Sequence, residues 1–162
     1  MIFITVGTQK FQFNRLLKEM DKLVEEGFII AENVFAQTGS STYIPQNYSF
    51  KAFLTKEELN KQIEANDLII THAGTGSIIN SIKSRKKVIG IPRDVKFGEH
   101  VDNHQYEIVE QFENSSMILA VKNIQELKSA IRDSENFKFK KYISNSEKFN
   151  ETLNEILNRW KK

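Results

Sequence analysis

The stretch Leu68-Ile69-Ile70-Thr71-His72-Ala73-Gly74-Thr75-Gly76-Ser77 decides the fold class of this chain. It opens with a short apolar run rich in branched side chains, which predicts a buried strand. The glycines at 74 and 76 predict a tight turn, and apolar residues at helical spacing follow it at 78, 79 and 82. A strand, a glycine-rich turn and a helix in this order are typical of one unit of an α/β protein.

The same alternation extends outward in both directions. Strands are predicted at Ile2–Val6, Phe28–Gln37, Tyr48–Phe53, Leu68–Thr71, Val88–Ile91 and Met117–Val121. Helices are predicted at 13–24, after the Thr55/Glu58 capping box, at 78–82, at Val101–Phe112, at Ile124–Ile131 and, amphipathic, at 145–162. Strands that alternate with helices predict a Rossmann-like, mostly parallel sheet flanked by helices.

Bulk composition sets limits on the class of protein. A chain of 162 residues with 40% hydrophobic residues suits one domain over 1–162. A net charge of +2 is too weak to indicate a nucleic-acid partner, and the lack of cysteine excludes disulfides and thiolate zinc sites. No signal peptide and no apolar run near the roughly 20 residues of a membrane span is evident, so we expect a cytoplasmic protein.

The glycine-rich turn predicts an anion site. Glycines let a ligand approach the backbone, and the free N–H groups and dipole of a helix start favour negative charge. Thr75 and Ser77 add hydroxyl donors, so the pattern favours a phosphate or diphosphate. The turn lacks Gly-Lys-Ser/Thr and the full dinucleotide fingerprint, and a plain strand-to-helix connection remains the alternative.

A second cluster of polar residues runs from Phe97 to Gln105. Its amides, imidazoles and carboxylates suit recognition of sugar hydroxyls. The alternative is a solvated helix start, where Glu99 and Asp102 favour the dipole. His100 and His104 also match the spacing of a metal pair, but the sequence offers no matched third ligand.

His72–Ser77 together with Asp102-Asn103-His104-Gln105 resembles the C-terminal, donor-binding domain of family 28 glycosyltransferases. The resemblance covers the chain from Ile4 to about Phe112. It is strongest to small free-standing subunits, found in bacterial capsule and exopolysaccharide synthesis and in the two-part dolichol-linked N-acetylglucosaminyltransferase. It implies a single half of a GT-B enzyme, active only with a partner subunit.

The resemblance also implies a set of roles. The nucleotide and its diphosphate would contact Gly7, Thr8, Phe53, His72, Gly74, Thr75, Gly76, Ser77 and Asn80. The donor sugar would contact Asn103, His104 and Gln105. Asn80 stands where the peptidoglycan-precursor enzyme of the family has a ribose-binding glutamate, so the ribose contact here differs.

The implied reaction is inverting transfer of a sugar from a UDP-sugar to a lipid-linked glycan in capsular or exopolysaccharide synthesis. No Asp-x-Asp motif occurs, and we expect neither metal nor cofactor, with the helix start stabilising the diphosphate. Glu99, His100 and His104 are candidate bases, and the partner is an equal source. A non-catalytic nucleotide-binding subunit is the alternative function.

The expected partner is a membrane-associated, acceptor-binding glycosyltransferase subunit, which would hold this chain at the inner face of the membrane. The terminal stretch 145–162 is a candidate docking helix, with Phe149, Leu153, Ile156, Leu157 and Trp160 on one stripe. Packing of that stripe on its own domain is the alternative.

Overall fold

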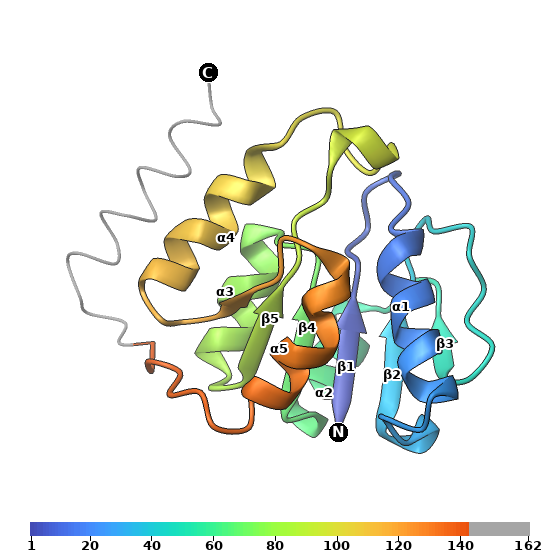
Figure 1. Cartoon of the computed structure of the whole chain (residues 1–162), viewed down its shortest axis with the longest axis horizontal. Coiled ribbons are helices and arrows are strands. Elements are labelled where there is room, and N and C mark those ends of the chain that lie inside the picture. The colour runs from blue at the N-terminus through green and yellow to red at the C-terminus, as the bar shows by residue number, and fades with distance from the viewer. Residues whose placement is uncertain (143–162) are drawn as a thin grey trace.

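The computed structural model describes residues 1–142, and these form a six-stranded parallel sheet with helices on both faces (Figure 1). The strands are β1 (Ile2–Thr5), β2 (Val34–Gln37), β3 (Ser49–Lys51), β4 (Leu68–Thr71), β5 (Lys87–Gly90) and β6 (Leu119–Ala120). They lie in the order β3-β2-β1-β4-β5-β6, and every pairing is parallel. The predicted Rossmann-like class is therefore confirmed.

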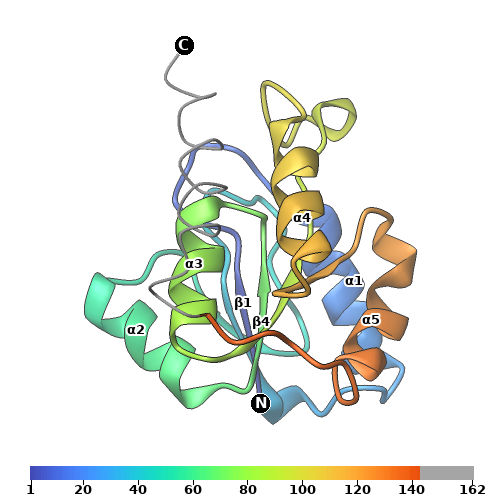
Figure 2. The same ribbon diagram turned by 90° about the vertical axis from the view of Figure 1, so that its left-hand side faces the viewer.

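Five α-helices cover the two faces of the sheet. They are α1 (Asn14–Glu25), α2 (Lys56–Ala65), α3 (Thr75–Lys83), α4 (His104–Asn114) and α5 (Leu127–Asp133). Figure 2 shows α2 and α3 on one side of β1 and β4 and α1 and α5 on the other. The apolar side chains of α4 pack in the same cluster as those of α2 and α3. Short 3₁₀ turns lie at Ala31–Asn33, Val95–Phe97 and Ile124–Glu126.

The central strands are buried on both faces, because their side chains alternate between two apolar clusters. In β1, Ile2 and Ile4 pack with α1 and α5, whereas Phe3 packs with α2, α3 and α4. In β4, Ile70 packs with α1 and α5, and Ile69 packs with α2, α3 and α4. Burial on both faces explains why these strands read as unbroken apolar runs.

The strand order reverses between β1 and β4. In an open parallel sheet, ligands bind at such a switch point, beyond the carboxyl ends of the strands. The loop after β1 carries Gly7 and Thr8, and the turn after β4 carries His72–Ser77. The reversal therefore brings the two predicted glycine-containing segments to the same edge of the sheet.

Several predicted boundaries are wrong. β2 begins at Val34, not Phe28, because residues 31–33 form a 3₁₀ turn. α4 begins at His104, not Val101, because the Asp102 carboxylate accepts a hydrogen bond from the His104 backbone N–H at 3.1 Å and turns the chain into the helix there. β3 and β6 are shorter than predicted. The candidate docking helix at 145–162 lies outside the described residues.

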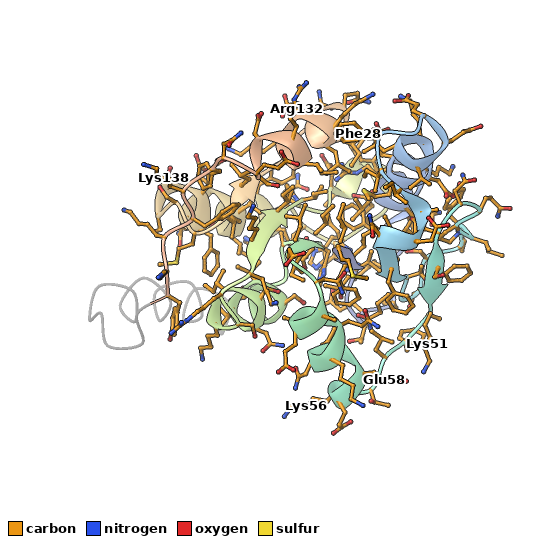
Figure 3. The ribbon with its side chains drawn as sticks, turned by 90° about the horizontal axis from the view of Figure 1, so that it is seen from below. Phe28, Lys51, Lys56, Glu58, Arg132 and Lys138 are labelled. Carbon is orange, nitrogen blue, oxygen red and sulfur yellow. The ribbon has the colours of Figure 1, made fainter. Side chains whose placement is uncertain are left out.

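The predicted capping box at the start of α2 is confirmed. The Thr55 hydroxyl accepts from the Glu58 backbone N–H, and the Glu58 carboxylate accepts from the Thr55 N–H. Glu58 also lies 2.7 Å from the Lys51 ammonium at the end of β3 (Figure 3). These contacts anchor the start of α2 beside the edge of the sheet. Within residues 1–142, no helix has the length and apolar character needed to cross a membrane.

Candidate functional site

Two adjoining hollows lie at the carboxyl edge of the sheet. The first hollow, about 390 Å³, is lined by Thr5, Gly7, Thr8, Gln9, Gln37, Leu54, Thr55, Lys56, Leu59, Ile63, His72, Gly74, Gly76, Ser77 and Asn80. The second hollow, about 560 Å³, is lined by Gln9, His72, Gly74, Thr75, Gly76, His100, Asp102, His104, Gln105 and Ile108. Gln9, His72, Gly74 and Gly76 line both, so the start of α3 divides two connected spaces.

The ring of His72 is held between two glycines. A Cβ on Gly7 would lie 2.6 Å from its Cε1 and Nε2, and a Cβ on Gly74 would lie 2.4 Å from its Nε2. Gly7 also has a φ of +76°, which disfavours any side chain. By contrast, a Cβ on Gly76 would meet nothing within 4 Å, because Gly76 faces open space in the hollows.

The contacts of the His72 ring favour one tautomer. Nδ1 lies 3.3 Å from the Thr5 carbonyl oxygen and 3.4 Å from the Thr71 hydroxyl. The carbonyl only accepts and is the nearer of the two, so we assign the hydrogen to Nδ1. Burial lowers the pKa of His72 to about 4, with a further contribution from the Arg93 guanidinium. The neutral ring therefore leaves a lone pair on Nε2, which has no hydrogen-bond partner among residues 1–142.

The start of α3 has the features of an anion site. Gly74 is the N-cap residue, the first turn contains no acidic side chain, and the following N–H groups point out of the helix end. The Thr75 hydroxyl is buried and makes no hydrogen bond within the described part of the chain. Backbone donors, a helix dipole and this spare hydroxyl suit a diphosphate.

The second hollow is lined on its far side by the start of α4. Gln105 is buried, and its side-chain oxygen accepts a hydrogen bond from the Arg93 backbone N–H at 2.9 Å. Nδ1 of His100 lies 3.1 Å from the Asp102 carboxylate, and its ring packs against Phe11 with centroids 5.2 Å apart. The His100 ring is thus fixed in orientation, whereas His104 is exposed.

Two buried charges hold the loops around the hollows. The Arg93 guanidinium donates to the carbonyls of Val6 and Phe11, at 2.7 and 3.2 Å, which spans the loop carrying Gly7. The carboxylate of Glu99, 1% exposed, accepts two hydrogen bonds from Arg15 Nε, at 2.8 and 3.1 Å. Burial lowers the pKa of Arg93 to about 10, although the negative charge of Glu99 acts in the other direction and raises it.

The structure brings most of the predicted site residues together. Those that line a hollow are Gly7, Thr8, His72, Gly74, Thr75, Gly76, Ser77, Asn80, His100, His104 and Gln105. Three do not. Glu99 is paired with Arg15, Asn103 accepts from the Val95 backbone N–H at 3.1 Å, and Phe53 is 49% exposed, with Leu54 lining the hollow instead.

Sequence reasoning missed Gln9, Lys56 and Arg93. Lys56 was visible as the first residue after the Thr55 cap, but nothing local showed that α2 would meet α3 across the first hollow. Arg93 follows a predicted strand, and its role depends on contacts with the distant loop 6–11. Among residues 1–142, no group of three or more His, Asp or Glu side chains is placed to hold a metal ion, so His100 and His104 gain no third ligand.

The chain has a Rossmann-like fold, and its two hollows lie at the switch point of the sheet, where folds of this class bind their ligands. The family follows from the sequence. Residues 1–159 match the model of the glycosyltransferase family 28 C-terminal domain, and the chain belongs to this family.

Relatives and solved structures agree with this assignment. The chain is 36% identical over 107 residues to the UDP-N-acetylglucosamine transferase subunit ALG13 of Candida albicans, which covers 66% of this chain and 32% of that protein. The solution structure of ALG13 has a TM-score of 0.59 at 20% identity, covering 94% and 93% of the two chains. MurG of Acinetobacter baumannii has a TM-score of 0.56 at 16% identity, covering 82% and 41%. These structures confirm that the chain has the fold of half of a GT-B glycosyltransferase.

Proposed function

We propose that the chain is the donor-binding half of a UDP-sugar glycosyltransferase and that a separate subunit binds the acceptor. The observation that carries the proposal is the pair of hollows joined at the start of α3. The helix end that both hollows share suits an anion, and the second hollow also has a rim of hydrogen-bonding side chains. A nucleotide diphosphate and the sugar attached to it need two such connected spaces.

The relatives support UDP-N-acetylglucosamine as the donor, because the matched Candida albicans protein is named as a UDP-N-acetylglucosamine transferase subunit. The acceptor is a lipid-linked glycan in this proposal. A role of this glycan in capsular or exopolysaccharide synthesis is supported only by the resemblance of the motifs. The named relatives favour a two-part N-acetylglucosaminyltransferase instead.

The reaction is an inverting displacement in which an acceptor hydroxyl attacks the sugar and the nucleoside diphosphate leaves. Backbone N–H groups at the start of α3 stabilise the leaving diphosphate without a metal. His100 is the better placed of the candidate bases. It lines the second hollow with its Nδ1 beside the Asp102 carboxylate, whereas Glu99 is occupied by Arg15.

The chain covers 41% of MurG, which joins two halves in one chain. In this proposal a separate subunit binds the acceptor and forms a second wall that faces the hollows. A membrane-associated subunit that supplies this second wall would hold the chain at the cytoplasmic face of the membrane. The chain spans about a third of the Candida albicans relative, so these points are proposals about the whole assembly.

The test is calorimetric titration of the purified chain with UDP and UDP-N-acetylglucosamine. GDP, ADP and NAD serve as controls, and each titration is repeated with magnesium and with EDTA. Selective binding of the uridine nucleotides, equal in both buffers, is expected. Preference for another nucleotide would overturn the donor assignment, and dependence on magnesium would overturn the metal-free mechanism.

A further inference from the structure

The inference concerns His72, and it rests on the proposed donor-binding function. His72 lies where the two hollows meet, directly before the turn that starts α3. Its side chain is 7% exposed, and its Nδ1–H is committed to the Thr5 carbonyl. Nε2 lies beside Gly74, where even a methyl group would collide with it.

A diphosphate in these hollows finds few positive charges. Of the residues that line them, only Lys56 carries a permanent positive charge, and Asp102 carries a negative one. A neutral His72 presents a lone pair, which repels a phosphate oxygen. A protonated His72 presents an N–H donor with a positive charge at the junction of the two spaces.

We propose that His72 takes up one proton at Nε2 when the donor diphosphate binds, so that the donor and a proton bind together. The proton comes from solvent, and no covalent bond of the ligand changes. The new Nε2–H donates to a diphosphate oxygen, while Nδ1–H keeps its bond to Thr5. A side chain at either glycine would crowd Nε2, because a Cβ on Gly7 or Gly74 would lie 2.6 or 2.4 Å from it.

The groups facing His72 explain why it is neutral without ligand. From the segment between β5 and α4, Arg93 and His100 both disfavour a positive charge on the ring, and burial does so most strongly. β1 and β4 contribute the neutral Thr5 and Thr71, and the first turn of α3 carries no charged side chain. A bound diphosphate adds negative charge and reverses this balance.

The sign of the pH dependence follows. The pKa of His72 is about 4 in the free protein, and the bound diphosphate raises it. At any pH between the free and bound values, binding takes up one proton, and affinity falls about tenfold for each unit that the pH rises. Below the free value the ring is already charged, and the dependence disappears.

The experiment is titration of the chain with UDP-N-acetylglucosamine by calorimetry. This ligand is a diphosphate diester and does not itself ionise near neutral pH. Titrations at pH 6.0 in buffers with different heats of ionisation give the number of protons taken up. A series from pH 5.0 to 6.5 gives the slope of affinity. We expect uptake of about one proton and a slope of about tenfold per pH unit.

Matched variants assign the proton. His72→Asn retains a donor to Thr5 and removes Nε2, and His72→Gln keeps an uncharged donor near Nε2. Both are expected to bind without proton uptake, and either alone serves if the other does not fold. His104→Asn, a change at the exposed histidine of the second hollow, is expected to retain the proton uptake whatever its effect on affinity.

The outcomes separate this inference from the function on which it rests. Binding by the parent chain without proton uptake overturns the inference and leaves the donor site intact. Uptake that persists in both His72 variants places the proton elsewhere and also overturns it. A parent chain that binds none of the uridine nucleotides overturns the donor site and the inference together.

Discussion

Two glycines in the same turn are expected to respond oppositely to the same added methyl group. In Gly74→Ala, the new Cβ would lie 2.4 Å from His72 Nε2, and Gly7 blocks the ring on its other side. Either the turn must shift or the hydrogen bond from Nδ1 to Thr5 must lengthen. We expect the free energy of unfolding to fall by the roughly 1–3 kcal/mol typical of overpacking. In Gly76→Ala, the Cβ meets nothing within 4 Å, and alanine at a helical position adds up to about 1 kcal/mol of stability.

Urea unfolding measures the free energy of unfolding of each variant, and titration with UDP measures the loss of nucleotide affinity. Gly76→Ala places its methyl group in the space that a diphosphate would occupy, so we expect affinity to fall at least about tenfold, or roughly 1.4 kcal/mol. A Gly74→Ala chain as stable as the parent would refute the packing argument. A Gly76→Ala chain with full affinity would refute the placement of the diphosphate.

Three other predictions test buried or half-buried ionisable groups. Arg15→Met should lower the free energy of unfolding by about 3 kcal/mol because it strands the Glu99 carboxylate, and Arg15→Met/Glu99→Leu should recover part of that loss in urea unfolding. Folding lowers the pKa of His72 from 6.5 to about 4. Between these pH values the folded chain therefore binds fewer protons than the unfolded chain. The unfolding free energy should drop by about 3 kcal/mol as the pH falls from 6.5 to 4, a component absent from His72→Gln. The Tyr43 hydroxyl donates to Asp21 at 2.6 Å, which raises its pKa to about 12. Asp21→Asn should return it toward 10 in an alkaline absorbance titration, and an unchanged midpoint would contradict the assigned cause.

The local signals in the sequence were sufficient for the α/β class and the capped start of α2. A buried parallel strand needs apolar side chains on both faces, so β1 and β4 are visible as unbroken apolar runs. The Thr55/Glu58 box depends only on residues three apart. Boundaries set by single turns, such as the 3₁₀ turn before β2, leave no periodic pattern and were misplaced.

In the candidate site too, features set by neighbouring residues were predictable from the sequence, and features set by distant contacts were not. The turn His72–Ser77 was identified because its glycines and its position before a helix are adjacent in sequence. The ion pair of Glu99 was not identified, because its partner Arg15 lies far away in the sequence, on the first helix. A carboxylate in a polar stretch looks like a base candidate until the fold shows which cation it meets.

The sequence by itself determined that the chain alternates strands with helices and that a glycine-rich turn opens α3, because both follow from neighbours along the chain. Only the tertiary structure decided that Gly7 and Gly74 enclose the His72 ring and that Nδ1 faces Thr5. It alone decided that Arg93 spans the loop from Val6 to Phe11. These contacts join distant segments that meet because parallel strands carry their connections to one edge of the sheet, and the charge state of a buried ring depends on that meeting.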